Sequence, residues 1–188
     1  MYGKAKSLKF NAFINGLRTI LNLVFPLVTF PYISRVLSVE EIGKYNFSDS
    51  IVSYFLLLAA LGINQYAIRE GMKFRDSQFA IDQFASRIFS VNVASTVISY
   101  WALGILLLCS NKLHNYFLCI SILSIQILFT TLGTEWLYSI YEEYTFITIR
   151  SIFFKIASII LLFAFVRNQG DYIKYTIITV IASAGSNV

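Results

Sequence analysis

The feature that most constrains this chain is a series of long apolar runs, each close to the roughly 20 residues that a helix needs to cross a bilayer. Only 13% of the 188 residues are charged, against about 25% in soluble domains. A transmembrane β-barrel is disfavoured, because its strands would alternate polar and apolar residues over about 10 positions. The sequence therefore predicts an all-α polytopic membrane protein.

The apolar runs predict a six-helix transmembrane bundle with no second soluble domain. Element boundaries read from a sequence are good to a few residues, and the expected spans are 11–34, 44–66, 85–109, 115–138, 148–166 and 172–188. The last run reaches Val188 without a basic flank or a cap. We therefore expect the chain to be truncated at its C-terminus, within a helix.

Basic residues predict the orientation, because cytoplasmic segments of membrane proteins carry an excess of Lys and Arg. An N-terminus inside the cell gives eight basic residues in cytoplasmic segments and five outside. The inside set is Lys4, Lys6, Lys9, Arg69, Lys73, Arg75, Arg87 and Arg150, and the outside set is Arg35, Lys44, Lys112, Arg167 and Lys174. The net charge of +5 is then explained by topology rather than by nucleic-acid binding.

The first expected helix carries a polar stripe and the only two prolines, Pro26 and Pro31. At about 100° per residue, every polar residue from 11 to 29 falls within roughly 100° of arc; these are Asn11, Asn15, Arg18, Thr19, Asn22 and Thr29. An Arg at membrane depth costs about 2.5–3.5 kcal/mol on insertion scales, so the stripe should face a partner helix or a watery cavity. Either a helix that bends with one wet face or a static packed kink fits the prolines.

Polar residues continue on the later helices. The second carries Asn46, Asp49, Ser50, Ser53 and Asn64 on one stripe, and the fifth carries Ser151, Lys155 and Ser158. Small hydroxyls commonly join membrane helices, so the charged members Arg18, Asp49, Glu135 and Lys155 are more informative. Glu135 and Lys155 flank a short turn and should lie at similar depth, which leaves two interpretations open: a structural ion pair or contact with a cargo.

The sequence carries no pattern typical of an enzyme. His114 is the only histidine, so a histidine-based metal cluster or catalytic base is not available. We found no Gly-rich phosphate loop and no H-E-x-x-H, and Cys109 and Cys119 lack C-x-x-C spacing. We expect no metal, no cofactor and no catalytic residue.

Three ordered stretches resemble one family of membrane proteins. They are "FPLVTFPYISRVLSVEEIGKYNFSDSIVSYF" at 25–55, "LGINQYAIREG" at 61–71 and "GTEWLYSIYEEYTFITIRSIFFKI" at 133–156. They are similar to bacterial polysaccharide flippases of the multidrug/oligosaccharidyl-lipid/polysaccharide exporter superfamily, including those of O-antigen and capsule repeat units. The resemblance covers essentially the whole chain. Family members have two lobes of about six helices, so it implies that this chain is an N-terminal lobe.

The resemblance implies a flippase that moves undecaprenyl-pyrophosphate-linked oligosaccharide across the bacterial inner membrane for O-antigen, capsule or exopolysaccharide synthesis. Arg18 and Lys155 would supply positive charge to the pyrophosphate. The other expected substrate contacts are Asn15, Asn22, Asn46, Asp49, Ser53 and Asn64. Expected partners are the lipid-linked oligosaccharide, the bilayer, and a polysaccharide polymerase and glycosyltransferases, but no nucleic acid. Two alternatives stay open: a drug or metabolite exporter of the same superfamily, and a noncatalytic membrane assembly subunit.

Overall fold

The structure, a computed structural model, describes residues 8–187, apart from the side chains of residues 8–12, Asn15 and Arg18. Over this range it contains helices and turns but no strand, which confirms the all-α class. The helices are α1 Leu8–Val36, α2 Val39–Ala60, α3 Ile63–Gly71, α4 Gln78–Cys109, α5 Phe117–Leu132, α6 Glu135–Ile140, α7 Tyr144–Phe165 and α8 Tyr172–Asn187. Short 3-10 turns lie at Met72–Phe74 and Asn111–Tyr116.

Five helical segments of the described chain are long and apolar enough to cross a membrane. They are Thr19–Val36, Val39–Phe74, Gln78–Cys109, Asn111–Ile140 and Tyr144–Phe165. The sixth expected span corresponds to α8, which has 16 residues and is shorter than the roughly 20 that a span requires. The described residues therefore support five spans, and the count of six stays a prediction.

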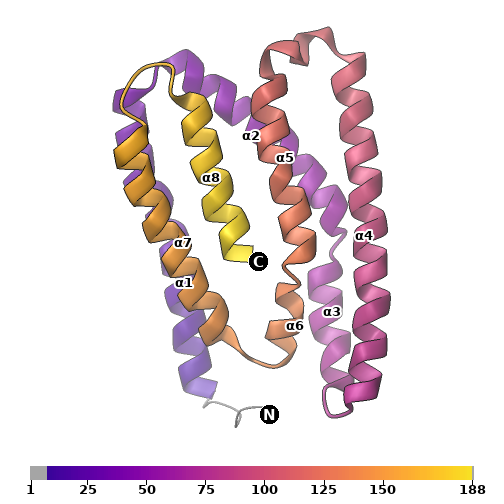
Figure 1. Cartoon of the computed structure of the whole chain (residues 1–188). Helices are drawn as coiled ribbons and strands as arrows, with labels where there is room; N and C mark the ends of the chain where they lie inside the picture. Colours follow the sequence, from indigo (N-terminus) through magenta and orange to yellow (C-terminus); the bar gives the residue numbers. More distant parts are fainter. Residues whose placement is uncertain (1–7, 188) are drawn as a thin grey trace.

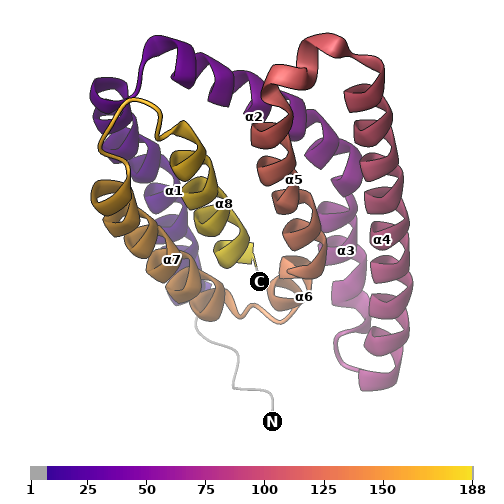
Figure 2. The same cartoon turned by 45° about the horizontal axis from the view of Figure 1, so that its top comes forward.

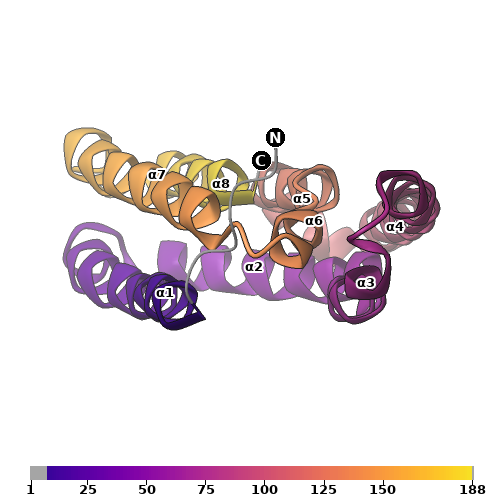
Figure 3. The ribbon, with the colours of Figure 1, turned by 90° about the horizontal axis from the view of Figure 1, so that it is seen from below.

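The helices form two layers, which Figure 3 shows from below. One layer contains α1, α2 and α3, and the other contains α7, α8, α5 and α4. In Figures 1 and 2, α8 lies between α7 and α5, and α1 runs along α7. An aromatic contact and a hydrogen bond fasten α1 to α7: the Tyr32 and Phe163 ring centroids are 4.5 Å apart, and the Tyr32 hydroxyl donates to the Val166 carbonyl at 2.8 Å.

A capping box sets the tight turn between α1 and α2. The backbone N–H of Glu41 donates to the Ser38 hydroxyl at 3.3 Å, and the Glu41 carboxylate accepts from the Ser38 N–H at 2.8 Å. These reciprocal bonds satisfy donors that the start of a helix leaves unpaired. The helix therefore begins at Val39, five residues before the start expected from hydropathy.

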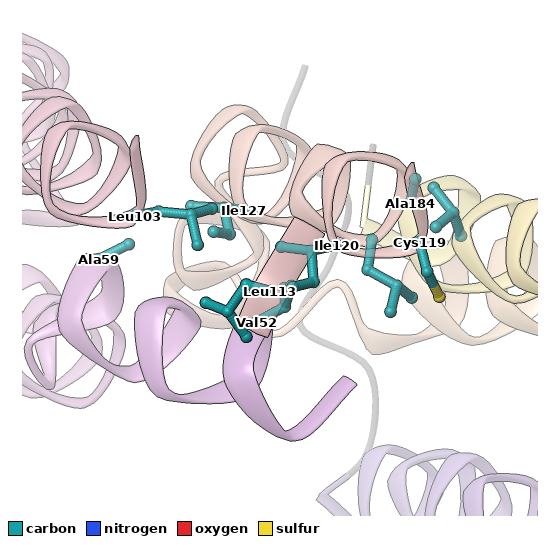
Figure 4. Close-up of a cluster of buried hydrophobic side chains, with 10 residues drawn as sticks. Val52, Ala59, Leu103, Leu113, Cys119, Ile120, Ile127 and Ala184 are labelled. Atoms are coloured by element: carbon teal, nitrogen blue, oxygen red, sulfur yellow. The ribbon is translucent and has the colours of Figure 1, made fainter. Parts of the chain in front are cut away.

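The main core joins the two layers, and Figure 4 shows it between α2, α4, α5 and α8. Its buried members are Val52, Ala59, Leu103, Leu113, Cys119, Ile120, Leu123, Ile127, Val180 and Ala184. A separate cluster, which we call the α3–α6 cluster, contains Ala67, Ile81, Trp136 and Ile140 at the other end of the molecule. These clusters follow from apolar residues spaced to lie on one helix face.

Two of the expected continuous spans contain a break. The second span stops at Ala60 and resumes at Ile63, with Leu61 and Gly62 between. The fourth stops at Leu132 and resumes at Glu135. Leu61 and Thr134 have φ values of 42° and 39°, a left-handed conformation that costs non-glycine residues roughly 1–2 kcal/mol. Hydropathy does not detect such breaks, because they lie within apolar sequence.

Candidate functional site

Polar side chains from α1, α7 and α8 meet in a groove of about 290 Å³, which we call the polar groove. Its lining residues are Asn22, Phe25, Ser151, Lys155, Thr179, Ala182, Ser183, Ser186 and Asn187. Most of them are amides, hydroxyls or small residues, and one is a lysine. Polar groups inside a membrane are costly unless they have a partner or a role, so this lining marks a candidate site.

Lys155 is the cation of the polar groove. Its ammonium group donates a hydrogen bond to the side-chain oxygen of Asn22 across the α1–α7 interface. The same nitrogen lies 6.0 Å from the centroid of the Phe25 ring, within reach of a cation–π interaction. The residue is half-buried and lines the groove, so its ammonium group is accessible from the groove.

The α8 side of the groove is a hydroxyl-bearing face. Thr179, Ser183 and Ser186 are spaced by four and three residues, so they lie on one side of the helix. The Thr179 and Ser186 hydroxyls donate to the carbonyls of Thr176 and Ala182, which leaves their oxygens able to accept from a ligand. Together with Lys155 and Asn22, this face can bind a molecule that carries hydroxyls and negative charge.

These α8 residues were missed by the sequence reasoning. The signal was present, because Thr179, Ser183 and Ser186 show the same spacing that identified Ser151, Lys155 and Ser158 on α7. Hydroxyls alone were treated as helix-joining groups. The α8 hydroxyls differ from ordinary helix-joining hydroxyls because they lie opposite a lysine from another helix, and only the tertiary structure shows this position.

The predicted pair of Glu135 and Lys155 stays a prediction, and the structure gives each of the two residues another contact. Glu135 Oε1 lies 3.7 Å from Nη2 of Arg150, whereas Lys155 bonds to Asn22. The Arg150 guanidinium is nine-tenths buried and also donates to the Ser186 carbonyl at 2.9 and 3.1 Å. Arg150 therefore links α6, α7 and α8 at one end of the polar groove.

The other predicted site residues lie in different places. Asn46 and Ser53 are exposed on α2, and Asp49 is partly buried near the Tyr45–Tyr175 contact with α8. Asn64 lies at the start of α3, beside a small cavity described below. None of these α2 and α3 residues lines the polar groove.

Asn15 and Arg18 belong to α1, but they are among the residues whose side chains the structure does not describe. Their positions on the helix place them one to two turns before Asn22 on the same face. Their roles stay predictions.

The described residues contain no group of three or more His, Cys, Asp or Glu that could hold a metal ion. Cys119 is buried and Cys109 is exposed, and neither forms a disulfide.

The helical fold and the five long apolar segments define a multi-pass membrane protein, and the polar groove lies between its helices. The family described as "Polysaccharide biosynthesis protein" matches residues 8–187. This chain belongs to that family.

One relative is the Escherichia coli (strain K12) protein named "Putative O-antigen transporter". The two are 25% identical over 150 residues, which is 80% of this chain and 36% of the relative. The chain thus matches about a third of that protein's length. No solved structure matches this chain.

Proposed function

We propose that this chain is the N-terminal lobe of a flippase that moves an undecaprenyl-pyrophosphate-linked oligosaccharide across the inner membrane, with its N-terminus in the cytoplasm and six spans. The observation that carries the proposal is the polar groove, in which Lys155 and Asn22 meet between helices of a membrane protein. The family and the O-antigen relative support the glycan cargo.

The groove offers what the head group of such a cargo needs. Lys155 supplies a positive charge for a pyrophosphate, and the α8 hydroxyls and Asn22 supply hydrogen bonds for sugar hydroxyls. Its volume of about 290 Å³ is at the lower end for ligand pockets. This lobe would therefore hold part of the head group, and the remainder of the cargo would contact other parts of the protein.

Residues outside the groove extend the proposed path of the cargo. Arg18 and Asn15 precede Asn22 on the same face of α1, so they would continue the cationic surface along the helix. Asn46, Asp49 and Ser53 would present polar atoms from α2, where Asn46 and Ser53 are exposed. Moving a lipid-linked glycan between leaflets makes and breaks no covalent bond, so we propose no catalytic residue and no cofactor. A polysaccharide polymerase and glycosyltransferases would act beside it.

The proposal is tested by charge substitutions in the full-length protein, expressed in its own cells. Lys155→Ala and Arg18→Ala should each reduce surface glycan and increase the lipid-linked precursor at unchanged protein level. Lys155→Arg and Arg18→Lys should retain much of the export, because they keep the charge.

The matched control is Lys174→Ala, since Lys174 is an exposed lysine in the first turn of α8. It should export normally. Normal export by both Lys155→Ala and Arg18→Ala would contradict the cargo role. If protein abundance fell in parallel with export, a structural role would explain these residues instead.

A further inference from the structure

The breaks in the second and fourth spans lie next to each other, as Figure 1 shows for the α2–α3 and α5–α6 junctions. A single small cavity adjoins both. On one side it is lined by Ala60 and Asn64, which flank the α2–α3 break, and on the other by Thr130 and Thr131, just before the α5–α6 break. Its remaining lining residues are Leu56, Ala59, Asn92 and Ile127.

Asn92 of α4 is the unusual member of this lining. The residue is 6% exposed, and its backbone carbonyl lies within hydrogen-bond distance of the Ser95 and Thr96 hydroxyls. Among the described residues, no hydrogen bond uses its side-chain amide. Its amide atoms are not among the fully buried side-chain atoms that lack a partner, so they are open to the cavity, where an occupant can pair with them.

The end of α2 also reaches the cavity. The last four carbonyls of an α-helix have no donor within the helix, and Ala59 and Ala60 bring the end of α2 to the cavity. The Ala59 carbonyl accepts from Ser95 at 2.6 Å.

The Thr130 hydroxyl donates to the Gln126 carbonyl and accepts from the Asn187 amide. The Thr131 hydroxyl lies 2.6 Å from that of Thr96, so one of these two hydroxyls donates to the other. Both threonine oxygens keep a lone pair with which they can accept from a molecule in the cavity.

The accessible volume of the cavity is about 10 Å³, close to the roughly 10–15 Å³ that one water molecule requires. Its lining is uncharged, which favours a neutral occupant over a cation. A water can donate to the hydroxyl and carbonyl oxygens and accept from an amide N–H, whereas a cation would leave the amide N–H groups of Asn92 unpaired.

We propose that this cavity is a binding site for one buried water molecule, which bridges Asn92 of α4 to the two helix breaks. The water pairs with the Asn92 amide and donates to oxygens that line the cavity, as water does for polar groups within membrane helices. The site is distinct from the polar groove and does not depend on the proposed transport function.

Radiolytic hydroxyl labelling with mass spectrometry tests this site in the purified protein, because it oxidises buried side chains next to bound water. Ile127 and Ile120 form a matched pair: both lie on α5 and both are 0% exposed, but only Ile127 lines the cavity. We expect several-fold more oxidation of Ile127 than of Ile120. Equal labelling of the two would overturn the proposal.

Two variants make the test specific. Asn92→Leu removes the amide and fills the cavity, so Ile127 labelling should fall to the level of Ile120. Thr131→Val keeps the side-chain shape and removes one hydrogen-bond partner of the water, so it should also lower Ile127 labelling. This variant provides the test if Asn92→Leu does not fold. Unchanged labelling in a folded variant would contradict the site.

Salt exchange separates water from a bound cation. Labelling of Ile127 should be the same in sodium chloride and in choline chloride. Labelling that occurs only after sodium is removed would show that a cation occupies the cavity, and it would overturn the assignment to water.

Discussion

Gly71, the last residue of α3, lies against Ile140, the last residue of α6, and this contact predicts a specific double-mutant effect. A methyl group added to Gly71 would collide with Cδ1 of Ile140 and would lie 3.1 Å from Cε1 of Phe84 and 3.2 Å from Cγ1 of Ile140. Ile140 belongs to the α3–α6 cluster and is 0% exposed, so it has little room to move.

The expected change in the free energy of unfolding for Gly71→Ala follows from two opposing contributions. Replacing Gly by Ala in a helix favours folding by about 0.5–1 kcal/mol, whereas overpacking a filled core costs about 1–3 kcal/mol. Gly71→Ala should therefore destabilise the protein by about 1 kcal/mol. Ile140→Val removes Cδ1, the atom in conflict, and alone should cost about 0.5–1.5 kcal/mol. In the double variant the two costs should not add, because the collision is gone.

Unfolding in mixed micelles, followed by tryptophan fluorescence, measures these free energies. Trp136 is 2% exposed within the same cluster, whereas Trp101 is 70% exposed, so a Trp101→Phe background isolates the relevant signal. Gly104→Ala is the control, since a methyl there meets no atom within 4 Å. The reasoning fails if Gly71→Ala is as stable as Gly104→Ala, or if the double variant shows the sum of the single effects.

Two further predictions concern other contacts. The Thr96 and Thr131 hydroxyl oxygens lie 2.6 Å apart between α4 and α5, and a cycle of Val substitutions should give a coupling of about 0.6 kcal/mol, at most about 1.7; zero coupling would exclude a direct bond. Hydrogen bonds from Lys174 and from the N–H groups of Arg167 and Asn168 lower the pKa of Asp171 to about 2. This pKa lies below the unfolded value of about 3.9. The ionised carboxylate therefore stabilises the α7–α8 loop fully above about pH 3.9, and this stabilisation is lost as the pH falls through about 2. Hydrogen exchange of the Asn168 N–H should report this loss, and Asp171→Asn should remove the pH dependence.

The sequence predicted the features that depend on residue type and helical spacing. Apolar runs identified the helices, and the polar stripe of α1 included Asn22, which the structure places in the polar groove. The fifth-helix pattern likewise included Ser151 and Lys155. The residues of one helix face follow from local geometry alone, and the substrate contacts proposed for these residues stay predictions.

Features that depend on relative helix positions were not predictable. Glu135 was expected at the depth of Lys155, and the structure adds Arg150 as a contact of Glu135. Arg150 and Lys155 differ by about 7.5 Å along an α-helix. Span boundaries read from hydropathy are no more accurate than this. The break at Leu61 was hidden for a different reason: leucine gives no sign of a left-handed conformation, which the adjacent Gly62 alone suggests.

The most direct test of the account is to map where a cargo sugar contacts the full-length protein. A lipid-linked oligosaccharide that carries a photoreactive diazirine on the sugar next to the pyrophosphate would be cross-linked in membranes, and the modified peptides identified by mass spectrometry. The account predicts labelling within residues 151–155 and 179–186, the segments that contribute the α7 and α8 lining of the polar groove, and a strong decrease in Lys155→Ala. Labelling confined to the exposed face of α4 around Trp101, or groove labelling that does not change in Lys155→Ala, would contradict it.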